Sequence, residues 1–254
     1  MGLLELRRVS KRFGGLEALA DLTMEVGERE ILGLIGPNGA GKTTVFNLVT
    51  GVYPVTSGEI RLAGERLDGL RPSSICARGI SRTFQKIRVF PRLSIHKNVV
   101  LGRHCRTRAG VLGGIVRPAW VRREEREVEA RASALLEFVG LATRADEEAR
   151  HLPHGQQRLL EIARALATEP KLLLLDEPAA GLTGDESEAL MRLVGRIRAE
   201  GVTVVIIEHD MDVVMGLSDR LVVLDHGEKL FDGPPKLAQK DPGVIAAYLG
   251  DEAG

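Results

Sequence analysis

The sequence has few cysteines, no long apolar run and no excess of charge of either sign. Its two cysteines, Cys76 and Cys105, lack a C-x-x-C spacing, so we expect reduced thiols rather than a disulfide framework or a zinc site. No window approaches about 18 uninterrupted apolar residues, which predicts no membrane-spanning helix. Lys and Arg together number 35, and so do Asp and Glu. This balance argues against a general nucleic-acid binder.

The most specific pattern present is G-x-x-x-x-G-K-[ST], which residues 36–43 match at every fixed position. Its glycines let the backbone turn tightly and direct N–H groups toward a polyphosphate. Lys42 would add charge against the β- and γ-phosphates, and the Thr43 hydroxyl suits Mg²⁺. The apolar run 31–35 predicts a buried strand before the loop, and we expect a helix to begin at Thr44. The predicted nucleotide contacts are Gly36, Pro37, Asn38, Gly39, Ala40, Gly41, Lys42, Thr43 and Thr44.

Apolar runs alternate with helical periodicity, which is typical of an α/β protein with a mostly parallel sheet covered on both faces. The predicted strands are residues 3–9, 31–35, 58–62, 80–84, 172–176, 202–208 and 220–224. Between residues 85 and 151 charge-rich helical sequence such as 121–139 takes over, and we interpret this part as an inserted helical subdomain. Its arginine-rich part, residues 103–131, is an interaction face or, as the interleaved glutamates favour, a solvated helix.

A phosphate-binding loop alone would fit a kinase, a GTPase, a helicase or a transport ATPase, so the later motifs must discriminate. The apolar run 172–175 ends in Asp176 and Glu177 at the expected carboxyl edge of the sheet. Asp176 suits a Mg²⁺ ligand, and Glu177 suits a general base that orients the attacking water. His209 follows the next strand, where its ring could donate to the γ-phosphate or hold that water.

The order of these motifs resembles that of the ATP-binding subunits of ABC transporters over essentially the whole chain. That order also includes Gln85 after a strand and Gly155-Gln156 before a helix. Three segments are similar to one branch, the LivG-type ATP-binding proteins of branched-chain amino acid importers. They are RTFQKIRVFPRLSIHKNV (82–99), LPHGQQ (152–157) and DPGVIAAYLG (241–250).

The resemblance implies a P-loop NTPase core with a mostly parallel sheet, an antiparallel β subdomain and a helical subdomain. Residues 1–254 would form a single ABC ATP-binding domain, with the core at 1–85 and 152–254 and the helical subdomain at 86–151. Phe13 would stack on adenine, and Gln85 would contact Mg²⁺ or the attacking water. Two subunits would close head to tail, so that Gly155 and Gln156 face the ATP of the partner.

The chain departs from the family pattern at two places. Pro153 and His154 replace the usual serine and glycine of the signature, so a serine hydroxyl is absent there. Thr183 stands where the family's motif ends in an aspartate that acts across the dimer. Coupling between the two sites could therefore differ from that of a standard transporter.

As a whole, the resemblance implies an ATPase that uses ATP and Mg²⁺ and lies peripherally on the cytoplasmic side of the cell membrane. Its partners would be transmembrane permease subunits, a second ATP-binding subunit that is identical or a paralogue, and indirectly a periplasmic-type binding protein. No nucleic-acid partner is expected. The alternatives are the ATPase of a urea importer or a lipopolysaccharide exporter, or a non-transport ABC protein acting on ribosomes or DNA.

Overall fold

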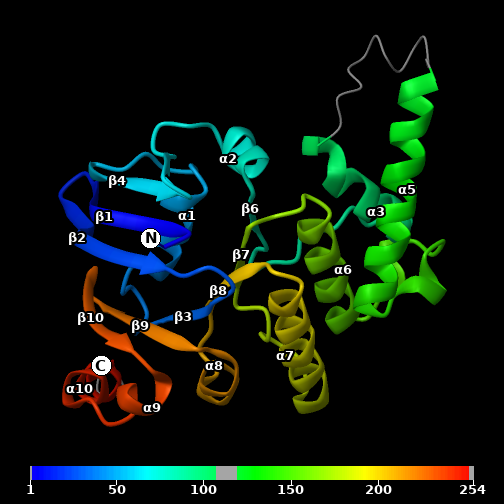
Figure 1. Ribbon diagram of the computed structural model, residues 1–254. Coiled ribbons are helices and arrows are strands. Elements are labelled where there is room, and N and C mark those ends of the chain that lie inside the picture. The colour runs from blue at the N-terminus through cyan, green and yellow to red at the C-terminus, as the bar shows by residue number, and fades with distance from the viewer. Residues whose placement is uncertain (1, 107–118, 252–254) are drawn as a thin grey trace.

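The computed structural model describes residues 2–106 and 119–251, in which a central six-stranded sheet has helices on both sides (Figure 1). Its strand order is β10-β9-β3-β8-β7-β6, and every neighbouring pair is parallel except β9 and β10. The strands are β3 (Ile31–Ile35), β6 (Ile80–Arg82), β7 (Leu172–Asp176), β8 (Thr203–Ile207), β9 (Arg220–Asp225) and β10 (Glu228–Gly233). The predicted α/β class and mostly parallel sheet are confirmed.

A second, antiparallel sheet has the order β2-β1-β4-β5 and occupies the blue and cyan part of Figure 1. Its strands are β1 (Leu4–Phe13), β2 (Leu16–Val26), β4 (Ser57–Leu62) and β5 (Glu65–Arg66). The strand list made from the sequence omits β2, β5 and β10. In β2 the buried positions alternate with exposed ones and the register with β1 shifts, so no continuous apolar run indicates it.

The helices are α1 (Lys42–Val49), α2 (Pro72–Arg78), α3 (Ile95–Gly102), α5 (Ala119–Val139), α6 (His154–Leu166), α7 (Gly184–Ala199), α8 (Met211–Leu217), α9 (Pro235–Ala238) and α10 (Pro242–Asp251). Short 3₁₀ turns are η1 (Arg103–Arg106), η2 (Ala142–Arg144) and η3 (Ala149–His151). The first helix begins at Lys42, two residues before the predicted Thr44. The reason is Gly41, whose φ of 102° ends the loop and lets helical geometry start at once.

Side chains of β7 show how the layers are built, because successive residues of a strand point to opposite faces. Leu172 and Leu174 join a core that includes Phe46 of α1 and the inner face of the antiparallel sheet. Leu173 and Leu175 join a second core, built with α3, α5, α6 and α7. The central sheet is thus buried on both faces, as its continuous apolar strands require.

Residues 86–151 contribute α3 and α5, which pack with α6 in the green region of Figure 1, on the opposite side of the molecule from the N-terminal strands. Part of the arginine-rich stretch 103–131 lies outside the described residues. Within α5, Arg123 and Glu127 form an exposed ion pair of 3.0 Å, which supports the solvated-helix interpretation. The subdomain boundaries remain predictions. Among the described residues neither Cys76 nor Cys105 forms a disulfide, and no described helix has the length and apolar character needed to span a membrane.

Candidate nucleotide-binding site

The glycine-rich loop joins β3 to α1 and has a backbone that only glycine allows at two of its positions. Gly36 has a φ of 147°, and a Cβ there would lie 2.1 Å from the Leu224 carbonyl oxygen. A Cβ on Gly41 would lie 2.8 Å from the Ala18 oxygen of β2. The Lys42 ammonium donates to the Gly36 and Pro37 carbonyls at 2.6 and 2.8 Å. The lysine therefore lies over the loop whose ligand it was predicted to contact.

The N-terminus of α1 points into this loop, and in the described structure no side chain occupies its free N–H groups. Gly41 is its N-cap, no side chain caps it, and no acidic residue lies in its first turn. The uncapped N–H groups and the positive end of the helix dipole favour an anion at this position. Thr43 is exposed in this turn and Thr44 is half-buried. This geometry fits a bound phosphate chain.

Gln85, Glu177 and His209 are brought together at the carboxyl edge of the central sheet. The Gln85 amide Nε2 donates to Glu177 Oε2 at 2.7 Å, and His209 Nε2 lies 2.8 Å from Glu177 Oε1. Glu177 follows β7 with a φ of 47°, in the left-handed region, and its N–H donates to the Ile207 carbonyl of β8. Three residues predicted separately therefore form one hydrogen-bonded chain, with the carboxylate at its centre.

Asp176 is buried at the end of β7 and is paired with a residue that sequence reasoning missed. Arg82, at the end of the neighbouring strand β6, donates from Nη2 to Asp176 Oδ2 at 2.6 Å. Its other terminal nitrogen donates to the Asn47 side chain of α1 at 2.7 Å. A clue is present in the sequence, since Arg82 lies three residues before Gln85 in a predicted strand. Burial of an arginine is uncommon without a partner, but sequence alone cannot name that partner.

Glu208, which precedes His209, is a second acid that the sequence analysis did not use. It is buried, and its carboxylate accepts hydrogen bonds from the backbone N–H groups of Ala179 and His209. Burial raises the pKa of Glu208, and the nearby charge of Glu177 acts in the same direction. Glu208 thereby ties the turn after Glu177 to the end of β8.

Gly155 and Gln156 lie on α6, and among the described residues neither of the two forms a hydrogen bond with the glycine-rich loop of its own chain. Gly155 is close to α7, where an added Cβ would lie 2.4 Å from a Glu186 carboxylate oxygen. The Gln156 side-chain oxygen accepts from Arg144 at 2.5 Å. Pro153, the N-cap of α6, and His154 are both exposed, and no side chain caps the helix. The start of α6 is thus an uncapped helix end that faces outward.

Thr183 has a local role that its sequence position did not reveal. It is the N-cap of α7, where its Oγ1 accepts from the Glu186 N–H and the Glu186 carboxylate accepts from the Thr183 N–H. This reciprocal arrangement is a capping box, which fixes the start of the helix. The capping of α7 is therefore a structural reason for a threonine at position 183.

Phe13 lies at the tip of the β1–β2 hairpin, and the residue is 40% exposed. The Tyr53 ring packs edge-on against it at 5.1 Å, and the Lys11 ammonium lies 4.8 Å from its centroid. The same β2 strand borders the loop, because its Ala18 carbonyl limits the space at Gly41. An exposed aromatic face in this position suits adenine stacking. Tyr53 is a second aromatic that the sequence analysis did not identify.

A buried ion pair connects α6 to the segment that carries Gln85. Arg158 donates to the carbonyls of Phe84 and Gln85 at 2.7 and 2.9 Å, and to Glu161 Oε2 at 2.8 Å. Glu161 in turn accepts from the N–H groups of Phe84 and Arg88, both at 3.3 Å. Burial raises the pKa of Glu161, and the Arg158 charge opposes that shift. The helix and the Gln85 segment are therefore held together by buried charges.

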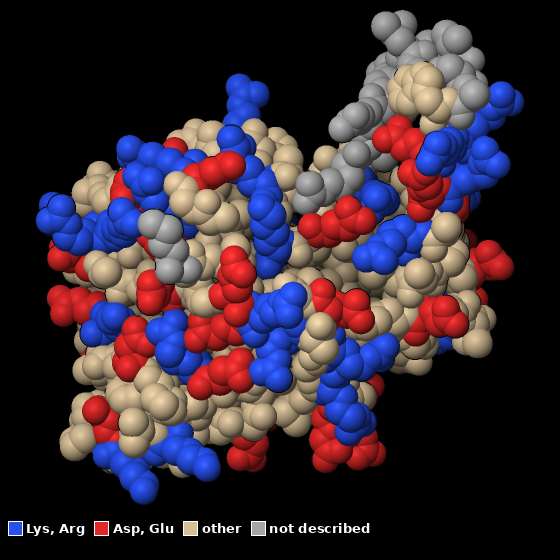
Figure 2. Space-filling model, in the orientation of Figure 1, with Lys and Arg blue, Asp and Glu red and all other residues tan. Residues whose placement is uncertain are grey.

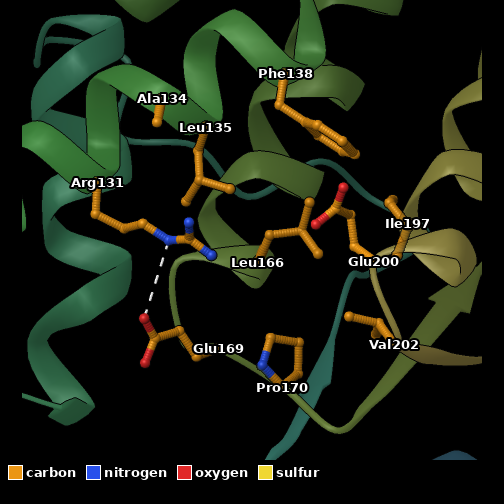
Figure 3. A pocket seen from close by; sticks show the side chains of 10 residues that line it. All are labelled: Arg131, Ala134, Leu135, Phe138, Leu166, Glu169, Pro170, Ile197, Glu200 and Val202. Carbon is orange, nitrogen blue, oxygen red and sulfur yellow. Dashed lines mark ion pairs between the residues drawn. The ribbon is translucent and has the colours of Figure 1, made fainter.

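A cavity of about 420 Å³ opens between α5, α6 and α7 (Figure 3). Apolar side chains such as Phe138 and Leu166 line it, and Arg131 is paired with Glu169 at 3.9 Å on its edge. Pro170 and Val202 place it beside the amino ends of β7 and β8, whereas the loop and the acids lie at the carboxyl edge. This cavity is therefore separate from the candidate site.

On the face that Figure 2 shows, basic and acidic residues are interspersed. Among the described residues no group of three or more His, Cys, Asp or Glu side chains could hold a metal ion by itself. The candidate Mg²⁺ ligands are instead the oxygens of Thr43, Gln85 and Asp176. Hydroxyl, amide and carboxylate oxygens are the donors that Mg²⁺ prefers, and Mg²⁺ commonly shares its shell with phosphates.

Comparison with known proteins decides the family. Residues 19–180 match the family described as ABC transporter. The chain belongs to this family. It is 44% identical to the high-affinity branched-chain amino acid transport ATP-binding protein BraF of Pseudomonas aeruginosa, over 98% of each chain. It is 42% identical to the corresponding LivG protein of Escherichia coli strain K12, again over 98% of each.

The ABC cassette fold is equally clear from solved structures. The ADP conformation of MJ1267, an ATP-binding cassette of an ABC transporter, superimposes with a TM-score of 0.86 at 32% identity. The alignment covers 98% of this chain and 99% of that one. The predicted resemblance to ABC ATP-binding subunits is confirmed, and membership of the family implies ATP binding and ATPase activity.

Proposed function

We propose that this chain binds ATP with Mg²⁺ and hydrolyses it to drive import of branched-chain amino acids through transmembrane permease subunits. The observation that carries the proposal is the chain of hydrogen bonds Gln85–Glu177–His209, at the same sheet edge as the glycine-rich loop. The cargo follows from the names of the BraF and LivG relatives. The chain would lie peripherally at the cytoplasmic side of the membrane.

Each side chain at the edge has a distinct task in this mechanism. Lys42 and the N–H groups of α1 bind the phosphates, and Phe13 stacks on the base. When bound, Mg²⁺ would supply charge neutralisation of the phosphates, held by Thr43, Gln85 and Asp176. Glu177 accepts a proton from the attacking water, and the hydrogen bonds of its two oxygens fix its orientation. His209, on the other side of that carboxylate, donates to it or to the γ-phosphate.

A second ATP-binding subunit, identical or a paralogue, completes the site in this proposal. The exposed, uncapped start of α6 at Pro153 and His154 would then contact the phosphates bound by the partner. A periplasmic-type binding protein would deliver the amino acid to the permeases and would act on this chain only indirectly.

The permease subunits would dock on exposed apolar side chains that lie just before α3, within α3 and at the start of α5. Phe90, Leu101 and Trp120 are all large and exposed. Phe90 follows the Gln85 segment within five residues, so a partner seated there would sense movement of Gln85. Aromatic side chains are enriched at protein–protein contacts relative to the rest of a protein surface.

Glu177→Gln tests the proposal with two readouts. Glutamine keeps the size of the side chain but cannot accept the proton, so we expect phosphate release to fall at least about hundredfold while ATP is still bound. Reconstituted with its own permeases in cells, the wild-type chain should support uptake of labelled leucine, and the variant should not. Lys42→Ala is the control that should lose ATP binding itself. Near-normal phosphate release by Glu177→Gln would exclude Glu177 as the base.

A further inference from the structure

The ion pair between Arg82 and Asp176 is almost completely dehydrated. The two side chains are 7% and 6% exposed, and Nη2 lies 2.6 Å from Oδ2. Within the described residues, Arg82 is the one side chain that donates to this carboxylate, and it reaches Oδ2. Asp176 is thus neutralised inside the protein before any ligand arrives.

Arg82 is held in place from several directions. Its guanidinium carbon lies over the ring of Phe46 and over that of Phe84, at centroid distances of 5.3 and 5.2 Å. Asn47 Oδ1 accepts from Nη1 at 2.7 Å, which links the arginine to the helix that follows the glycine-rich loop. The buried Nε has no hydrogen-bond partner in the described structure. An unpaired buried donor is destabilising, so the fold retains this geometry at the expense of stability.

A fixed cation beside a carboxylate disfavours a second cation at that carboxylate. Two like charges a few ångström apart repel strongly where water is excluded. Free Mg²⁺ must also lose water ligands to bind, and a carboxylate that is already paired with Arg82 attracts the cation only weakly. The phosphates of a nucleotide change this balance, because they bring several negative charges to the same place.

We infer that Arg82 makes metal binding at Asp176 conditional on nucleotide: it is a positioning residue that occupies the carboxylate and prevents the nucleotide-free site from taking a divalent cation. The inference rests on the proposed function, in which Asp176 faces the Mg²⁺ that accompanies ATP. A purely structural role for Arg82 predicts lower stability when it is removed, but no gain of metal binding.

Arg82→Gln separates these two roles in nucleotide-free protein. The substitution leaves Asp176 buried and charged without its cation, so we expect Mn²⁺, measured by electron paramagnetic resonance, to bind at least about tenfold more tightly than to the wild type. In thermal unfolding the variant should have a lower Tm in EDTA and recover part of the loss in Mg²⁺. The wild-type Tm should not respond to Mg²⁺ without nucleotide. Sodium chloride at matched ionic strength controls for screening.

Two further variants keep the test decisive if Arg82→Gln folds poorly. Arg82→Lys keeps the cation and should bind Mn²⁺ as weakly as the wild type. Asn47→Ala loosens the arginine without removing it and should bind Mn²⁺ with intermediate affinity. The inference is overturned if the nucleotide-free wild type binds Mn²⁺ as tightly as Arg82→Gln, or if neither Arg82→Gln nor Asn47→Ala binds it more tightly than the wild type. The proposed function fails separately, if wild-type protein does not bind ATP in the presence of Mg²⁺.

Discussion

Three acidic residues at the carboxyl edge of the sheet have different environments and therefore different roles. Asp176 is paired with Arg82, and Glu177 is bound by an amide and an imidazole. Glu208 is buried, and within the described part of the chain its hydrogen bonds come from backbone N–H groups. Backbone donors stabilise the carboxylate but do not neutralise it, and the raised pKa of Glu208 shows that burial outweighs them. Its charge is held close to Glu177 by the fold.

The burial of the Glu208 carboxylate should be visible in the pH dependence of the unfolding free energy. Because burial raises the folded pKa of Glu208 above the ordinary glutamate value of 4.5, the unfolded chain loses its proton first as pH rises. Glu208 therefore contributes most stability below pH 4.5, and that contribution is lost as pH rises through its folded pKa. We expect the unfolding free energy of the wild type minus that of Glu208→Gln to fall between pH 4.5 and 8 in urea titrations. A constant or rising difference would show that Glu208 is not destabilised by its charge.

At the scale of single elements, α6 joins two parts of the site. Its buried face carries Arg158 and Glu161, which bind the backbone of residues 84–88, and its N-terminus faces outward. A movement of α6 must therefore displace Gln85 or break the buried pair. In this way the helix that would contact the partner's nucleotide is mechanically connected to the residue beside Glu177.

Arg158→Met should be strongly destabilising, because it leaves Glu161 buried and without its cation. Removing one member of a buried pair typically costs about 3–5 kcal/mol. The exposed pair Arg192–Glu188 on α7 is the control, and Arg192→Met should cost no more than about 0.5 kcal/mol. Chemical denaturation measures both. The loss in Arg158→Met should be smaller below pH 4.5, where Glu161 is protonated in both states. Equal losses in the two variants would contradict the anchoring role.

The elements that the sequence predicted well are those whose burial is simple. Strands β3 and β7 are buried on both faces and appear as uninterrupted apolar runs, so even their ends were correct. Strand β2 has one solvent face and a shifting register, so it was missed. The motif residues were recognisable because phosphate chemistry restricts them. Arg82 instead acts through Asn47 and Asp176, and Arg158 through the backbone carbonyls of residues 84 and 85, all far away in the sequence. Such pairings depend on the tertiary fold, and sequence order does not contain them.

On the scale of the whole molecule, the parallel strands bring the proposed catalytic residues together at one edge of the central sheet. The N-terminus of α6 lies away from that edge. Asp176 ends β7, and the loop, Glu177 and His209 follow β3, β7 and β8, whose carboxyl ends share one edge. The start of α6 lies outside this group, packed on α7 through Gly155. A single chain therefore contains both halves of the proposed composite site without joining them, which is the geometry expected of a subunit that works as a pair.

His154→Asp tests this pairing without disturbing the subunit itself. An acid in the first turn of α6 complements the helix dipole, so the monomer should keep its stability or gain about 0.3–1 kcal/mol. The same charge would repel the phosphates of the partner's ATP. In a Glu177→Gln background with Mg²⁺ and ATP, light scattering should show a dimer, which His154→Asp should convert to monomers that still bind ATP. His151→Asp, at an exposed histidine three residues earlier, should leave the dimer intact. A dimer that survives His154→Asp would mean that α6 does not face the partner's nucleotide.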